Sequence, residues 1–165
     1  MADIVQFEMK GLDQLQEALE KKGKDGTLAL RIALSAGGGV VRDAMRDGCP
    51  VEKDGENSGF LKGQLRVKTI VHKDVTGIAI VGASNAIYPG KEGKRGRVSF
   101  KTAGGKVVDF ISKHAGQVTA SRVARWLEFG TSHARKFPFM SQGWEKSKVA
   151  AFNKIVEKLK EKLEL

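Results

Sequence analysis

The chain has 165 residues, of which 29 are Lys or Arg and 19 are Asp or Glu, so its formal net charge is +10. A hydrophobic fraction of 41% is enough to build a core, which excludes a wholly disordered chain, and the length fits one domain over residues 1–165. The lone cysteine excludes an internal disulfide framework, and no apolar run reaches the roughly 18 residues of a membrane span.

The N-terminal third of the chain predicts two helices. The first has leucines on one helical face, namely Leu12, Leu15 and Leu19. Thr27 is the expected N-cap of a second, longer helix, which runs to about Asp47 and stops before Pro50. The glycine run 37–39 lies inside this second helix, and it indicates either a kink or a place where another backbone comes close.

Two strands are expected in the middle of the chain, after a loop at 51–63. Residues 64–72 alternate between apolar and polar side chains, which is typical of a strand with one buried face. Residues 76–83 form the second strand and place Ile78 and Ile80 on one face. The short turn between the two segments predicts an antiparallel hairpin.

A glycine-rich and basic segment follows the hairpin. From Tyr88 to Gly116 the chain has seven basic residues and two acidic ones, so this stretch carries +5, half of the net charge. Residues 98–100 and 107–111 are expected to pair as a small hairpin within it. We expect the segment 88–120 to be an insertion in the domain, either as a solvated basic loop or as a surface that faces a partner or DNA. The candidate residues for that surface are Lys91, Lys94, Arg95, Arg97 and Lys101.

The C-terminal part of the chain is helical in pattern. Residues 119–129 fit a short helix, although an alternating strand fits them too. Pro138 stands where helices favour proline, in the first turn, and apolar residues at helical spacing continue to Leu163. The whole pattern predicts an α+β fold: a small antiparallel sheet packed against two or three helices, with a long basic Gly-rich insertion and a long C-terminal helix.

The side chains that carry enzyme chemistry show no recognisable arrangement in this sequence. The histidines at positions 72, 114 and 133 are scattered, no Cys–His metal spacing occurs, and phosphate-binding and nucleophile-elbow motifs are absent. We therefore expect no catalytic, cofactor-binding or metal-binding residues, no cofactor, and a protein that is not an enzyme.

The most informative stretch runs from Ala124 to Met140. Glu128 lies between two apolar residues just before a Gly-Thr turn, where its carboxylate is suited to accept N–H or Arg bonds and fix the turn. We expect Glu128 to be structural, Phe129 and Phe139 to be core residues, and Gly130 to have an unusual backbone angle. The motif residues are Glu128, Phe129, Gly130, Thr131, Pro138 and Phe139.

These residues resemble a known family. The pattern Ala-Arg-aromatic-X-Glu-Phe-Gly-Thr, then a basic spacer, then Pro-Phe before a final helix is similar to the tail-completion or head–tail joining family of long-tailed bacteriophages. The stretches 11–15 and 58–62 agree with the family in order, so the resemblance spans nearly the whole chain. The chain departs from the family at Cys49, where Ala is usual, and in the segment 88–116, to which the family pattern assigns no role.

The resemblance implies a non-enzymatic structural protein of the virion. Members of this family form a ring at the head-proximal end of the tail or in the neck, which completes the tail and joins it to the DNA-filled head. For this chain that implies a homo-oligomeric ring, a hexamer by preference or a dodecamer, assembled in the host cytoplasm. The implied partners are the tail tube protein and a neck, head-completion or portal-adaptor protein, with genomic DNA passing through the lumen and no membrane involved.

The net charge supports a second hypothesis, a basic nucleic-acid-binding module. The basic segment has few aromatic side chains that stack on bases, which favours contact with a nucleic-acid backbone or an acidic protein surface over base reading. A steep loss of DNA affinity between about 50 and 200 mM salt distinguishes a phosphate binder from a ring protein.

Overall fold

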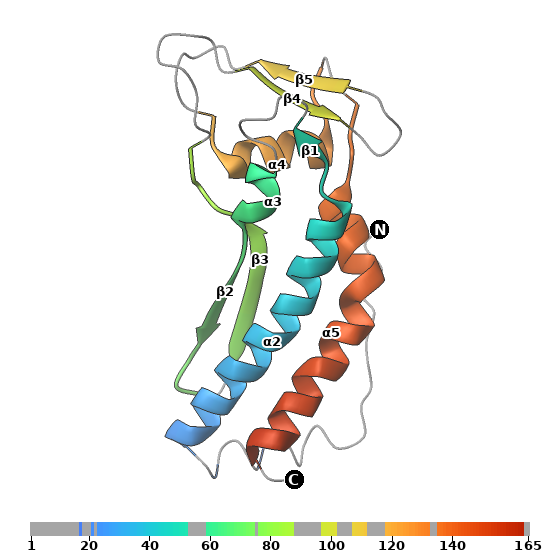
Figure 1. The fold of residues 1–165 in the computed structure, drawn as a ribbon. Helices are drawn as coiled ribbons and strands as arrows, with labels where there is room; N and C mark the ends of the chain where they lie inside the picture. Colours follow the sequence, from blue (N-terminus) through green and yellow to red (C-terminus); the bar gives the residue numbers. More distant parts are fainter. Residues whose placement is uncertain are drawn as a thin grey trace.

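The computed structural model describes residues 17, 21, 23–52, 59–74, 76–87, 97–101, 107–111, 118–132 and 135–163. These residues form a mixed α+β fold, as the sequence predicted, in which helices and two antiparallel sheets pack along an elongated molecule (Figure 1). The helix expected around 12–20 lies outside the described residues, apart from Glu17, whose carboxylate lies 3.0 Å from Lys21 Nζ.

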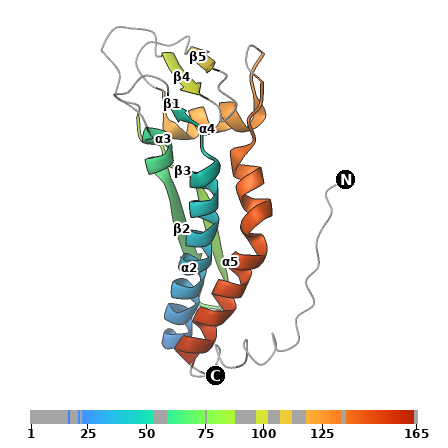
Figure 2. The same ribbon diagram turned by 45° about the vertical axis from the view of Figure 1, so that its right-hand side comes forward.

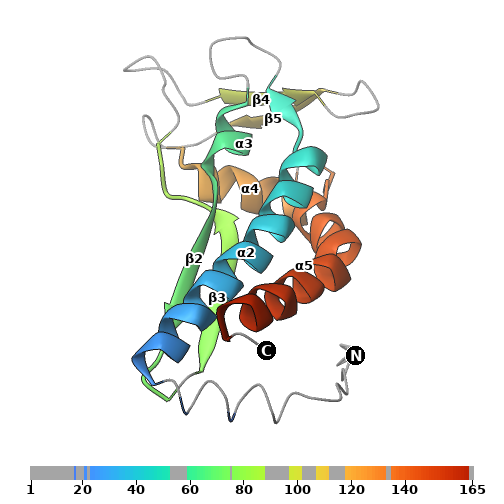
Figure 3. The same ribbon diagram turned by 60° about the horizontal axis from the view of Figure 1, so that its bottom comes forward.

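Two long helices and a hairpin form the body of the molecule. Helix α2 (Lys24–Gly48) and helix α5 (Phe139–Leu163) have 25 residues each and lie side by side (Figure 2). Strands β2 (Leu65–Val71) and β3 (Gly77–Ala83) form the predicted antiparallel hairpin. Figures 1 and 3 show α2 between this hairpin and α5, so α2 is the central element of the fold.

The glycine run of α2 lets both neighbours come close. A Cβ at Gly37 would overlap Ile155 of α5 and lie 2.9 Å from the Ala151 carbonyl oxygen. Gly38 faces the hairpin, where a Cβ would lie 2.6 Å from Val67 Cγ1. Helix α2 continues through the run, so the expectation of a close backbone approach is confirmed.

Helix α2 begins earlier than expected, at Lys24. Its N-cap is Gly23, whose φ of 51° lies in the left-handed region that favours glycine. Thr27 Oγ1 donates to the Gly23 carbonyl oxygen at 2.9 Å and caps no N–H, so the predicted N-cap is wrong. The helix therefore starts at the turn made by Gly23, about one helical turn before Thr27.

The hairpin has one covered face and one open face. Val67 and Ala79 lie against Gly38 of α2. Ile78 and Ile80 share the opposite face, as predicted, and they are 57% and 51% exposed. We call this surface the isoleucine face, and its exposure leaves apolar area available for contact with another molecule.

The second sheet has three strands, two from the predicted insertion and one from an earlier part of the chain. Strands β4 (Arg97–Lys101) and β5 (Val107–Ile111) pair antiparallel, so the small hairpin expected there is confirmed. A third strand, β1 (Val51–Glu52), pairs with β4. Strand β1 lies in a segment that we expected to be a loop. It pairs with the edge of β4 that β5 does not occupy.

The chain leaves the body and returns to it at one point. Ile87 and Thr119 form an antiparallel bridge, and the Ala120 N–H donates to the Ala86 carbonyl oxygen at 2.9 Å. The segment 88–118 therefore starts and ends at adjacent positions. Apart from its two strands and Val118, this segment lies outside the described residues.

Buried apolar side chains form two clusters, which we name by their place in Figure 1. The upper core draws on α2, α3 (Phe60–Gln64), β2, α4 (Ala120–Phe129) and α5. Its members are Val41, Met45, Cys49, Leu61, Leu65, Val118, Ala120, Val123, Ala124, Leu127, Phe139 and Ala151. The lower core joins the start of α2 to the end of α5, and its members are Ala29, Leu30, Ala33, Leu159 and Leu163.

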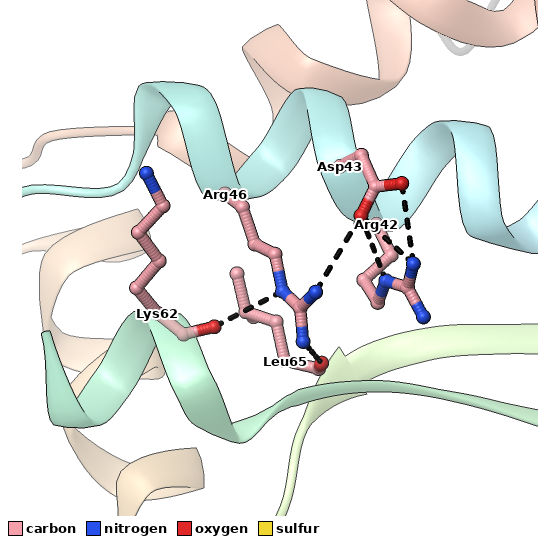
Figure 4. Close-up of polar contacts among 5 residues, drawn as sticks. All are labelled: Arg42, Asp43, Arg46, Lys62 and Leu65. Atoms are coloured by element: carbon pink, nitrogen blue, oxygen red, sulfur yellow. Dashed lines mark hydrogen bonds and ion pairs between the residues drawn. The ribbon is translucent and has the colours of Figure 1, made fainter.

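A polar clamp fixes α3 to α2 beside the upper core (Figure 4). Arg46 Nε donates to the Lys62 carbonyl oxygen at 3.2 Å, and Arg46 Nη2 donates to the Leu65 carbonyl oxygen at 3.1 Å. Carbonyl groups at the end of a helix lack intrahelical partners, so these bonds satisfy them. Asp43 Oδ1 lies 3.5 Å from Arg46 Nη1, and the hydrogen bond from Arg42 lowers the pKa of Asp43. The clamp therefore ties α2 to the end of α3 and to the first residue of β2.

Candidate partner-binding surface

Helix α4 turns one face to the upper core and the other to solvent. Thr119 Oγ1 accepts the Arg122 N–H at 3.3 Å and caps the start of the helix. The buried residues of α4 are Ala120, Val123, Ala124, Leu127 and Glu128. Their helical spacing confirms the helical interpretation of residues 119–129 and excludes the alternating strand.

Glu128 joins the end of α4 to the start of α5. Its Oε2 accepts the Met140 N–H at 2.9 Å, and its Oε1 accepts the Ser141 N–H at 2.9 Å and the Ser141 hydroxyl. The first N–H groups of a helix have no intrahelical partner, and the helix dipole favours a negative charge there. Glu128 is only 8% exposed. The expectation that Glu128 is structural is confirmed, and the N–H groups that it binds belong to the next helix.

The other motif residues divide between core and surface. Gly130 has a φ of 78°, so its unusual backbone angle is confirmed. Phe139 is fully buried in the upper core, as predicted, and Pro138 directly precedes α5. Phe129 is 76% exposed, so its assignment to the core is wrong. It lies two residues beyond the buried Leu127, a rotation of about 200° around the helix, and therefore points to the opposite side.

A pocket of about 510 Å³ opens between α4 and α5 beside Phe129. It is lined by Met45, Ala83, Ser121, Ala124, Arg125, Glu128, Phe129, Met140, Ser141 and Trp144. The lining is mostly apolar, and the carboxylate of Glu128 is already bonded to α5. Arg125 is exposed and forms no ion pair with another residue that the structure describes, so its guanidinium is available at this pocket. We call this site the Phe129 pocket.

Four exposed cations lie on α4 and on the segment between α4 and α5, and we call them the basic rim: Arg122, Arg125, Arg135 and Lys136. None of them forms an ion pair with another residue that the structure describes. The Phe137 N–H donates to the Leu127 carbonyl oxygen at 2.6 Å, which returns the chain to the end of α4 just after the last two cations. Glu128, the acidic residue of the stretch 118–138, is buried, so the positive charge of the rim is unbalanced there.

A second cavity of about 520 Å³ adjoins the Phe129 pocket at Trp144, which lines both. Its walls come from β3 and α5, and its floor is α2 at the glycine run. Glu145 and Lys148 stand among its lining residues and pair with each other, with 2.5 Å between Glu145 Oε2 and Lys148 Nζ. The apolar surface therefore continues from the Phe129 pocket along α5.

The basic candidates of the insertion are not among the residues that line this site. Lys91, Lys94 and Arg95 fall outside the described residues, while Arg97 and Lys101 mark the two ends of β4. Sequence reasoning missed the basic rim and Trp144. The signal was present in α4, because Arg122 and Arg125 are three residues apart and lie on the side away from the buried face.

Nucleophile and metal chemistry find little support in the described residues. Cys49 is buried, and this burial raises the pKa of its thiol to about 12, so the reactive thiolate is not populated near neutral pH. Within the described ranges, His, Cys, Asp and Glu nowhere gather in threes that could hold a metal ion. The same part of the chain contains no helix that is long and apolar enough to cross a membrane.

The resemblance to the tail-completion family rests on the sequence motifs alone. Comparison with protein-family models, with curated proteins and with solved structures finds no match for this chain.

Proposed function

We propose that this chain is a structural subunit of a ring at the head-proximal end of the tail, or in the neck, of a long-tailed bacteriophage. In that place it completes the tail and joins it to the DNA-filled head. The observation that carries the proposal is the exposure of large apolar side chains on separate elements of a single chain. The resemblance of residues 124–140 to the tail-completion family supports the same function.

Two of these exposed sites suit contact between copies of the chain. Ile78 and Ile80 form the isoleucine face of the hairpin, and Leu28 and Ile32 are exposed on α2. A closed ring of identical subunits needs two different patches on each subunit, one for each neighbour. The isoleucine face and the α2 patch lie on different elements and meet that requirement.

The motif residues support a structural function. Glu128 binds the start of α5, and Phe139 fills the upper core beside it. These contacts hold the end of α4 and the start of α5 together. A rigid junction is what a subunit needs if its binding patches are to face neighbours in one geometry.

The test is the mass of the purified protein in solution, alone and mixed with assembled tail tubes, with negative-stain images of both. We expect a ring, or a cap at one end of the tubes, that the double substitution Ile78→Ser with Ile80→Ser disrupts. Val149→Ser, which also removes an exposed apolar side chain, is the matched control on α5. The proposal is refuted if the wild-type protein is a monomer and does not bind tail tubes.

The basic rim favours a second candidate function, nucleic-acid binding. Its four cations have no acidic partner among the described residues, and Phe129 stands exposed beside Arg125. For that function, DNA affinity must fall steeply between about 50 and 200 mM salt. If the protein stays monomeric, forms no ring and binds DNA with an affinity that falls steeply with salt, nucleic-acid binding replaces the first candidate function.

A further inference from the structure

We propose that the Phe129 pocket and its basic rim bind an acidic segment of a partner protein, which places an apolar side chain in the pocket. The proposal goes beyond the ring, because it concerns a different protein and a surface that does not include the isoleucine face. It also stands if the chain acts as a monomer.

Charge defines the first property of the partner. Arg122 and Arg125 are exposed on the outer side of α4, and Arg135 and Lys136 are exposed where the chain returns to that helix. The sole carboxylate of this stretch, Glu128, is buried and bonded to the start of α5. A partner segment that carries several Asp or Glu residues complements this field, which speeds association and excludes basic partners.

The pocket defines the second property. Its apolar lining includes Trp144, which is 49% exposed, and Met140, while Phe129 stands at 76% exposure. Partly exposed aromatic side chains beside an arginine are the residue types that dominate binding energy at protein interfaces. A cavity of about 510 Å³ has room for a Leu or Phe side chain of the partner. The partner segment is therefore acidic and carries an apolar anchor.

The same features favour a protein segment over nucleic acid. A phosphate backbone would gain from the cations, but it has no group that fills an apolar pocket beside the buried carboxylate of Glu128. Base stacking would need open aromatic faces along a track, whereas Trp144 lies at the junction of two cavities. An apolar side chain next to carboxylates satisfies both the pocket and the rim.

The experiment measures binding of the full-length protein to a fluorescent peptide built from repeats of Glu-Glu-Leu and Glu-Glu-Phe, by fluorescence anisotropy. A second peptide has Ser in place of every Leu and Phe, and oligothymidylate serves as the nucleic-acid probe. We expect the first peptide to bind at least about tenfold more tightly than the second, because only the first fills the pocket. Oligothymidylate is expected to compete poorly.

Variants locate the binding site. Arg125→Glu and Phe129→Ala are each expected to weaken binding of the first peptide by about tenfold or more. Both side chains are exposed, so neither substitution should lower the melting temperature. Arg31→Glu is the matched charge reversal, since Arg31 is exposed in the first half of α2, and Figure 1 shows that this end of the helix lies away from α4. It is expected to leave the peptide affinity unchanged.

Three results would overturn the proposal. The first is equal affinity for the two peptides, and the second is tighter binding of oligothymidylate than of the acidic apolar peptide. The third is dissociation of a ring into monomers by Arg125→Glu or Phe129→Ala, which would show that a second copy of the chain occupies the pocket. If the unsubstituted protein gives the first of these results and still forms rings, this proposal alone is refuted and the proposed function stands.

Discussion

The upper core and the lower core differ in how much of the chain they bring together. The upper core has 12 buried members: ten come from five helices and strands, including α3, α4 and β2, and the other two are Cys49 and Val118. The lower core has five buried members, all from α2 and α5. The candidate partner surface and the Glu128 contact both lie at the upper end. The end of the molecule with the larger core is therefore also the end where Glu128 joins α4 to α5.

The largest effect is expected from Phe139→Ala in the upper core. Phe139 is fully buried, and truncating a buried Phe removes packing and leaves a cavity, which destabilises a protein by about 3–5 kcal/mol. Urea unfolding would measure the change in the free energy of unfolding. Val149→Ala, on the exposed side of the same helix, should change it by no more than about 0.5 kcal/mol. Similar losses for the two variants would remove the distinction between core and surface on α5.

The thiol of Cys49 reports when the upper core opens. Burial raises its pKa to about 12, so the thiol stays protonated and protected at pH 8 in the folded protein. With Phe139→Ala, labelling by a thiol reagent should accelerate by about a hundredfold or more, because the open state is more populated. The measurement is the labelling rate in native buffer. Rapid labelling of the unsubstituted protein would show that the upper core is loosely packed.

Glu128→Ala is expected to destabilise the protein by about 2–3 kcal/mol. The substitution leaves the Met140 and Ser141 N–H groups without their charged acceptor, and bonds to charged groups contribute about 1.5–3 kcal/mol. Thermal unfolding would give the loss. Glu145→Ala removes a carboxylate that is exposed and paired with Lys148, and it should change stability by less than about 1 kcal/mol. If both variants lose the same amount, Glu128 is an ordinary surface charge.

The smallest effect belongs to the lower core. Leu159→Ala is expected to destabilise by about 2 kcal/mol, the low end for a buried Leu, because the cluster is small and its surroundings relax. Cys49 labelling should remain slow in this variant, since a local opening of the helix ends does not reach the upper core. The same two measurements, urea unfolding and the labelling rate, test it. Fast labelling would mean that the two cores open as one unit.

Local patterns predicted most of the regular elements. The hairpin β2–β3, the pairing of β4 with β5, and helix α5 follow from alternation or helical spacing in the sequence, which depend on neighbouring residues. Residues 119–129 fitted both a helix and a strand, and the buried face of α4 decides for the helix. Strand β1 could not be predicted this way, because Val51 and Glu52 pair with β4, a distant part of the chain. The start of α2 was misplaced because Gly23 supplies the turn that Thr27 was expected to cap.

The candidate site was predicted in part. The structural role of Glu128 could be inferred from its place before a Gly-Thr turn, but its partners lie in the next helix and only the tertiary structure shows them. Phe129 was misassigned because hydrophobicity was weighed without the angular position that Val123 and Leu127 set. The Phe129 pocket joins residues of four elements, and no local pattern reports such a convergence.

The bridge between Ile87 and Thr119 has a consequence for protein engineering. Paired strand positions are only about 4.5–5.5 Å apart, so a tight turn of a few residues could replace the chain between them up to the buried Val118. A foreign domain with adjacent termini could equally be grafted there, as such sites tolerate domain insertion. We therefore expect that residues 88–117 can be exchanged while α2, α5 and the β2–β3 hairpin keep their arrangement, as long as the buried Val118 is retained.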